Sequence, residues 1–144
     1  MKLTIDASVY IATRYPSEPG YQECAEFFRL VLLTEDAIQV PTLLLVEVAS
    51  AAARKTRNPS DGLQLSSEIR TMGSHEWHPL DEAGALAAIE LGTRLFLRGA
   101  DAVYSAVAAL TDSTLISLDR ELLSRASGAV KTMTPRDWLN AQPS

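Results

Sequence analysis

The chain has 144 residues, of which 47% are hydrophobic and 22% are charged, a composition close to that of ordinary globular proteins. This length predicts one domain over residues 1–144 whose core needs no disulfide, and the single cysteine, Cys24, excludes a disulfide within the chain. The formal net charge of −5 counts against a protein that holds nucleic acid by basic side chains alone, because such binding depends on neutralising phosphates. Carboxylates that hold a cation remain compatible with this charge.

The N-terminal segment and the apolar runs bear on where the protein works. Asp6 interrupts the apolar start, whereas a signal peptide needs an uninterrupted apolar segment. No apolar run approaches the length that spans a bilayer. We therefore expect a cytoplasmic protein.

Short apolar runs alternate with helical patterns through the first half of the chain. Clusters of Pro and Gly at 16–20 and 58–62 predict breaks, and Thr42 is expected to cap the helix that follows it. The expected elements are a strand at 2–5, helices at 8–13 and 21–34, a strand at 37–40 and a helix at 42–55.

The second half continues the alternation, and its uninterrupted β-rich run at 114–118 is the clearest strand of the sequence. Arg98-Gly99 is expected to end one helix and Gly128 another, while Thr134-Pro135 has the cap and first-turn proline of a helix start. The expected elements are a helix at 63–72, a strand at 76–80, helices at 81–97 and 100–111, a strand at 114–118, a helix at 121–127, a strand at 130–133 and a final helix from 134.

This alternation predicts an α/β fold, a three-layer α/β/α sandwich around a mainly parallel central sheet. Ligands of such sheets bind beyond the carboxyl ends of the strands. Asp6 directly follows the first strand and Asp119 follows the run Ile116-Ser117-Leu118, so two strands would bring carboxylates to one edge. Each aspartate also fits an ordinary helix N-cap.

Two further acids lie on predicted helices. Glu47 stands among Leu43, Leu44, Val48 and Ala51, on an apolar face where an ionised carboxylate is costly unless it is paired or bound to a metal. The alternative is a Glu at the edge of that face, paired with Arg54 or Arg57. Asp101 lies in the first turn of a helix of small apolar residues, and N-capping also explains it.

The four carboxylates Asp6, Glu47, Asp101 and Asp119 together predict a site for a hard divalent cation such as Mg²⁺, which prefers oxygen ligands. Such an ion activates a water molecule and stabilises charge on a phosphodiester. The histidines His75 and His78 have no third ligand nearby, so they predict no zinc site. Cys24 lies beside Phe27 and Phe28 and is expected in the core rather than as a nucleophile.

With these acids in place, the chain resembles the PIN-domain family, and within it the VapC-like toxins of bacterial toxin–antitoxin modules. Four segments carry the resemblance, in the order and at the spacing of the family, and only together are they specific. They are Leu3-Thr4-Ile5-Asp6-Ala7-Ser8, Pro41-Thr42-Leu43-Leu44-Leu45-Val46-Glu47-Val48, Arg98-Gly99-Ala100-Asp101-Ala102-Val103-Tyr104-Ser105-Ala106-Val107-Ala108 and Thr114-Leu115-Ile116-Ser117-Leu118-Asp119-Arg120-Glu121-Leu122-Leu123.

The resemblance implies a PIN fold and an endoribonuclease that depends on Mg²⁺ or Mn²⁺, cleaves cellular RNA of the tRNA or rRNA class and arrests growth. It also implies a homodimer and a cognate antitoxin protein. Position by position, Asp6, Glu47 and Asp101 match the core acidic triad, and Asp119 matches the fourth, more variable acid.

Accessory positions follow from the same resemblance. Ser8 and Ser117 match positions where the family often has a hydroxyl near the metal, although many relatives carry Thr in place of Ser117. Basic side chains could also meet RNA phosphates around the acids, and Arg98 and Arg120 adjoin the proposed ligands. The other basic candidates are Arg14, Arg54, Lys55 and Arg57.

Two other functions fit parts of the pattern. A catalytically inactive PIN-like module would act only by binding RNA or protein partners, and four intact acids argue against it. An aspartyl-phosphate enzyme of the haloacid dehalogenase type would want a second aspartate two residues after Asp6, where this chain has Ser8.

Overall fold

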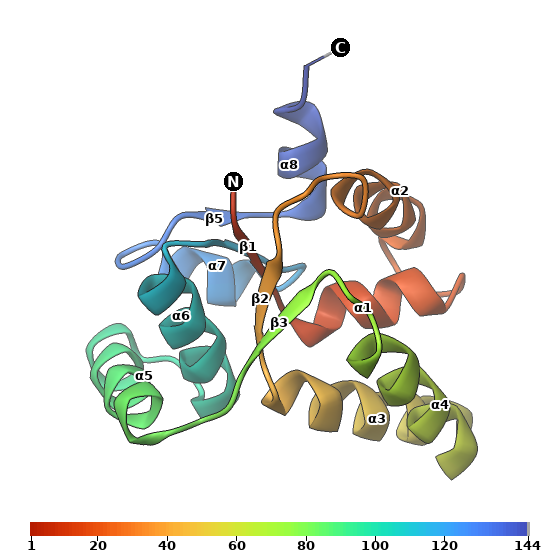
Figure 1. Ribbon diagram of the computed structural model, residues 1–144, viewed down its shortest axis with the longest axis horizontal. Helices are drawn as coiled ribbons and strands as arrows, with labels where there is room; N and C mark the ends of the chain where they lie inside the picture. The colour runs from red at the N-terminus through yellow and green to blue at the C-terminus, as the bar shows by residue number, and fades with distance from the viewer. Residues whose placement is uncertain (144) are drawn as a thin grey trace.

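Five parallel strands form the central sheet of the computed structural model, which describes residues 1–143 (Figure 1). Across the sheet they are β3 (His75–His78), β2 (Ile38–Pro41), β1 (Leu3–Ile5), β4 (Thr114–Ile116) and β5 (Thr132–Met133). Every neighbouring pair is parallel, with Leu3 opposite both Ile38 and Thr114. The carboxyl ends of all the strands therefore meet at one edge, with β1 in the middle.

Helices cover both faces of this sheet. In chain order they are α1 (Ala7–Arg14), α2 (Tyr21–Val31), α3 (Leu43–Thr56), α4 (Pro59–Arg70), α5 (Glu82–Leu95), α6 (Gly99–Thr111), α7 (Arg120–Ala126) and α8 (Pro135–Asn140). Helices α5 and α6 lie on one side and α1, α2 and α4 on the other, while α6 packs across β1, β2 and β4 (Figure 1). The predicted α/β/α sandwich with a parallel sheet is confirmed.

The core is formed by the central strands and the helix faces that pack on them. All residues of β1, β2 and β4 are buried, as expected for strands covered on both faces. On the α2 side, the buried ring of Phe27 makes edge contacts with Phe28 and Trp138, at centroid distances of 5.4 and 5.1 Å. No helix within residues 1–143 is both long enough and apolar enough to cross a membrane.

The predicted break between α3 and α4 is present, but it is confined to Arg57 and Asn58 and does not reach residue 62, because α4 already begins at Pro59. Asn58 accepts a hydrogen bond from the Ser60 amide at 3.0 Å as the N-cap, and Pro59 occupies the first turn, where its missing N–H costs nothing. Gly62 lies inside the helix, against the backbone of Ala49 on α3. Its glycine permits a close approach of two helices and does not mark a turn.

We expect Gly62→Ala to destabilise the protein by about 1–3 kcal/mol, although alanine is normally the better helix former. A Cβ atom at this position would lie 2.3 Å from the Ala49 carbonyl oxygen, so the two helices would have to move apart. Urea unfolding of the variant measures the effect. Gly99→Ala on α6 is the matched control, because its new methyl group meets nothing within 4 Å, and equal stability of the two variants would contradict the expectation.

Three smaller predictions about helix ends are wrong. Thr42 has helical dihedrals and makes no side-chain cap hydrogen bond. Helix α5 ends at Leu95 and is followed by Phe96 at a positive φ of 57°, while Gly99 already belongs to α6. Helix α7 is closed by Ser127, and Gly128 does not have the left-handed backbone of a terminating glycine.

Candidate active site

Asp6 lies where the central strand β1 passes into α1, and its side chain is only 7% exposed. Its Oδ1 accepts hydrogen bonds from the amide of Ser8 at 3.1 Å and from the Ser8 hydroxyl at 2.5 Å, and its Oδ2 accepts one from the Ser117 hydroxyl at 2.7 Å. Burial raises the pKa of Asp6 to about 6, and the charge of Asp101 adds to this against the opposing hydroxyl bonds. Within residues 1–143 no ion pair joins a basic group to Asp6, so its ionised carboxylate is a buried charge without a counter-charge.

Two serine hydroxyls join the end of β1 to the turn after β4. The Ser117 oxygen, which donates to Asp6, also accepts from the Asp119 amide at 2.9 Å, and the Ser8 oxygen accepts from the Leu118 amide at 3.2 Å. Each hydroxyl therefore fixes both Asp6 and the backbone that carries Asp119. The serines predicted to have accessory roles thus contact the predicted acid directly.

Arg98 bridges the next two predicted acids. Its Nε lies 3.2 Å from Asp101 Oδ2 and its Nη2 lies 3.0 Å from Asp119 Oδ2. Burial raises the pKa of Asp101, and the hydrogen bond and charge of Arg98 oppose that rise. Asp119 also caps α7, since its Oδ1 accepts from the amides of Glu121 and Leu122. One of its oxygens therefore caps the helix while the other pairs with Arg98. Capping and participation in the acidic site are therefore compatible.

Glu47 approaches the same region from α3. Its Oε1 is buried and has no hydrogen-bond partner among residues 1–143, and no ion pair joins it to Arg54 or Arg57 within that part of the chain. The Tyr104 hydroxyl is likewise buried and makes no hydrogen bond of good geometry within residues 1–143. Burial, followed by the charge of Glu47 and the contact of the phenol with the Glu47 carboxylate, raises the pKa of Tyr104 well above its usual value. Glu47 and Ser8 line one cavity together.

The predicted residues thus lie at the carboxyl edge of the sheet, although their carboxylates are not close enough together to form a complete metal-binding cluster. Within residues 1–143, no three acidic, histidine or cysteine side chains lie close enough together to hold an ion. The unneutralised Asp6 and the unpartnered oxygen of Glu47 nevertheless fit a hard cation, because each is a buried oxygen that lacks positive charge. The all-oxygen donor set fits Mg²⁺ or Mn²⁺.

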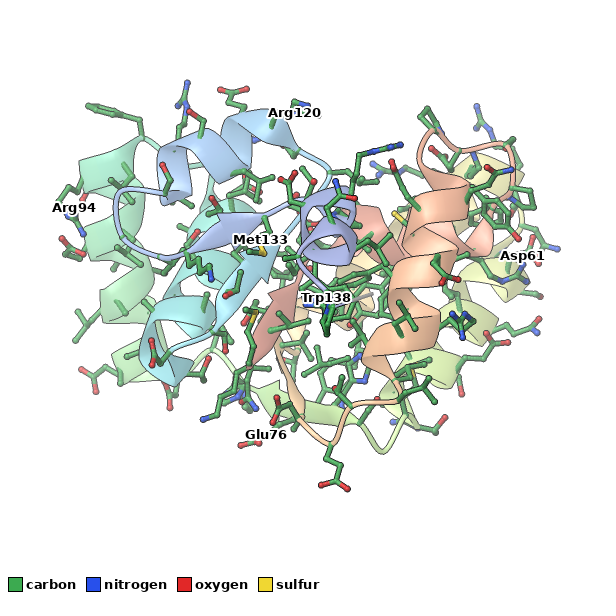
Figure 2. The ribbon with its side chains drawn as sticks, turned by 90° about the horizontal axis from the view of Figure 1, so that it is seen from above. Asp61, Glu76, Arg94, Arg120, Met133 and Trp138 are labelled. Carbon is green, nitrogen blue, oxygen red and sulfur yellow. The ribbon has the colours of Figure 1, made fainter. Side chains whose placement is uncertain are left out.

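Tyr104 was not among the sequence candidates. It lies three residues after Asp101 on α6 and is 2% exposed, and its phenol faces the charge of Glu47. A large polar ring in a run of small apolar residues was the signal in the sequence. Arg120, which was a candidate, is exposed at the edge of α7 (Figure 2).

The histidines and the cysteine take part in packing and hydrogen bonding elsewhere. His75 Nε2 lies 2.6 Å from the Tyr10 hydroxyl, and burial lowers the pKa of His75 to about 4. His78 Nε2 lies 2.6 Å from Gln39 Oε1. Cys24 is buried in the core as predicted, and burial raises the pKa of its thiol to about 12.

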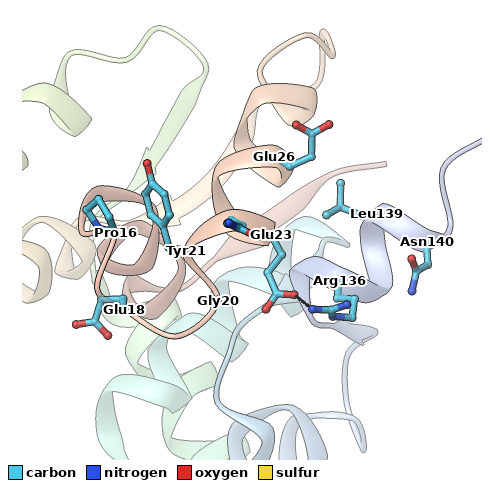
Figure 3. A pocket seen from close by; sticks show the side chains of 10 residues that line it. Pro16, Glu18, Gly20, Tyr21, Glu23, Glu26, Arg136, Leu139 and Asn140 are labelled. Carbon is cyan, nitrogen blue, oxygen red and sulfur yellow. Dashed lines mark ion pairs between the residues drawn. The ribbon is translucent and has the colours of Figure 1, made fainter.

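A separate cavity of about 620 Å³ lies between the start of α2 and α8 (Figure 3). The ion pair between Arg136 and Glu23, at 2.5 Å, closes one side of it. Glu18 lines this cavity and also the one that contains Glu47. Gly20, at a positive φ of 85°, brings the loop before α2 close to Leu118 and hence to the acidic edge.

The family model of the PIN domain matches residues 3–128. The chain belongs to the PIN domain family. The resemblance inferred from the four sequence segments is therefore confirmed, and the match spans all four predicted acids of this PIN domain. No curated protein sequence matches the chain.

Several solved structures share the fold of this PIN domain. VapC20 of Mycobacterium tuberculosis, a toxin that cleaves the sarcin–ricin loop, is 16% identical with a TM-score of 0.72, over 90% of this chain and 97% of that one. FitAcB from Neisseria gonorrhoeae is 16% identical with a TM-score of 0.71, over 94% and 99%. PAE2754 from Pyrobaculum aerophilum is 17% identical with a TM-score of 0.69, over 97% and 88%. At these identities the likeness concerns the fold.

Proposed function

We propose that this PIN domain is an endoribonuclease that depends on Mg²⁺ or Mn²⁺ and acts in the cytoplasm as the toxin of a toxin–antitoxin pair. The buried Asp6 carboxylate at the carboxyl end of the central strand carries the proposal. Its oxygens are held by Ser8 and Ser117, and it has no counter-charge within residues 1–143. A residue that only caps a helix does not have to be buried in this way, so the burial of Asp6 fits a cation ligand better than a cap alone.

When bound, the cation supplies an activated water and stabilises the charge that develops on the scissile phosphate. The hydroxyls of Ser8 and Ser117 hold Asp6 in one orientation toward it. Glu47 and Asp101 are the further proposed ligands, and Asp119 holds a second ion or orients the water. Arg98, which pairs with Asp101 and Asp119, is an exposed positive group next to these proposed ligands and would be available to a phosphate.

The substrate and partners are proposed from relatives with the same fold. VapC20 is a toxin that cleaves the sarcin–ricin loop, so a single-stranded loop of ribosomal RNA or tRNA is the proposed substrate class here. A solved toxin–antitoxin complex from Klebsiella pneumoniae has the same fold, which supports a cognate antitoxin for this chain. A homodimer is proposed with it.

The test is cleavage of total cellular RNA by the purified chain. We expect cleavage with Mg²⁺ or Mn²⁺, none with EDTA, and recovery when the metal is added back, because the acids alone supply no nucleophile at neutral pH. Mapping of RNA 5′ ends identifies the substrate. Cleavage that persists in EDTA overturns the proposal, and growth arrest without any cleavage points to the inactive binding module instead.

A further inference from the structure

A cavity of about 510 Å³ lies between α1 and α3 and begins at the acidic edge. Ser8 and Glu47 line it at that end, and Arg54 lines it further along α3. Glu47, Ser50 and Arg54 share one face of α3, because they are spaced by three and four residues. Arg54 therefore lies about two turns, or roughly 10 Å, along the helix from Glu47.

Arg54 is the basic residue among those that line this cavity, and Glu18 lines it as well, while the neighbouring Arg14 and Lys55 do not. The charged ends of Arg14 and Lys55 each lie 5.5 Å from the ring centre of Tyr15, and Lys55 is held by Glu18 at 2.6 Å. Arg54 is exposed, and none of the ion pairs within residues 1–143 includes it. Its guanidinium is therefore available to an anion.

The walls of the cavity leave space for a ligand. Small side chains, Ala12, Ser50 and Ala51, line it, and Val46 presents an apolar surface that is 62% exposed. A volume of 510 Å³ falls within the range of about 300–1,000 Å³ that is usual for ligand sites. The proposed ligand Glu47 lies at one end and Arg54 further along, which suits a phosphodiester chain: one phosphate would lie at the acids, where a bound cation would meet it, and another would lie at Arg54.

We propose that this cavity binds the nucleotides of single-stranded RNA next to the cleaved bond, with Arg54 holding a phosphate and the Ser50–Ala51 wall facing a sugar or base. This inference rests on the proposed nuclease function, and it places the reacting phosphate at the end of the cavity that contains Glu47. It adds a substrate-positioning role for Arg54, which contacts RNA away from the reacting atoms. A protein segment bound in the same cavity would not require Glu47 at one end and Arg54 further along.

The test measures binding of a labelled single-stranded RNA by fluorescence anisotropy in EDTA, where no cleavage occurs. We expect Arg54→Met to weaken binding about tenfold at low salt and to reduce the slope of log affinity against log salt by about 0.7, since one phosphate contact is lost. Ser50→Trp fills the cavity without changing charge, so it should weaken binding with an unchanged slope. Both residues are exposed, and thermal melts check that both variants fold.

Arg94→Met is the matched control, because it removes the same charge from α5, at the opposite end of the molecule from α4 and its neighbour α3 (Figure 2). We expect its affinity to stay within about twofold of the wild type. Equal losses in Arg54→Met and Arg94→Met, or unchanged binding by Ser50→Trp, overturn the inference. If the inference fails in this way but the protein still cleaves RNA with metal, the proposed function stands. If binding depends on Arg54 but no cleavage occurs, the proposed function is refuted and the RNA-binding cavity is retained.

Discussion

Replacing Asp6 by Asn is expected to lower the rate of metal-dependent RNA cleavage by about 10³-fold, or about 4 kcal/mol of transition-state stabilisation. Asn keeps the size of the side chain and one oxygen, but it has no negative charge to offer a cation. The hydroxyls of Ser8 and Ser117 still find partners on the amide, so the local structure should persist. The loss would therefore reflect missing charge rather than a misfolded site.

Two measurements show whether missing charge or a misfolded site causes the loss: the cleavage rate at saturating Mg²⁺ and the binding of Mn²⁺ by electron paramagnetic resonance. Asp61→Asn is the matched control, because Asp61 is half-buried in the first turn of α4, away from the acidic edge in the fold (Figure 2). We expect this control to cleave RNA at the wild-type rate. Cleavage by Asp6→Asn within a few-fold of the wild type would remove Asp6 from the site and, with it, the main support for the nuclease.

Much of this arrangement follows from local sequence signals. The alternation of apolar runs and helical patterns predicts the α/β fold, and a parallel sheet then brings the ends of β1 and β4 together, so Asp6 and Asp119 were predicted at one edge. Glu47 was singled out because it interrupts an apolar helix face, and its buried, unpartnered oxygen agrees with that. These signals depend on neighbours in the sequence.

Other features depend on contacts that no local pattern specifies. Gly62 resembled a turn residue because its packing partner, Ala49, is on another helix. The bridge from Arg98 to Asp119 spans 21 residues, and its ion pairs exist only once α6 and α7 take their places. Asp119 similarly was open to two explanations, and only the structure separates the oxygen that caps α7 from the one that faces Arg98.

The burial of Asp6 also predicts how stability depends on pH in the absence of metal. Its pKa is about 6 in the folded protein and 3.8 in the unfolded chain, so the folded state binds the proton more tightly. The resulting stabilisation is complete below pH 3.8 and is lost as the pH rises through about 6. A difference of this size amounts to about 3 kcal/mol, and Asp6→Asn, which cannot ionise, should not lose it.

Urea unfolding of the wild type and Asp6→Asn between pH 4 and pH 7 in EDTA measures this difference. We expect the two proteins to converge near pH 4 and Asp6→Asn to be the more stable by about 3 kcal/mol at neutral pH, since all other titrating groups are shared. Saturating Mg²⁺ should restore stability to the wild type alone, by about 2.7 kcal/mol at one hundred times the dissociation constant, because the cation binds the ionised carboxylate. Parallel pH profiles would show that Asp6 is already neutralised in the fold. In that case the protein would hold Asp6 as a helix cap, without the unmet charge that a cation needs.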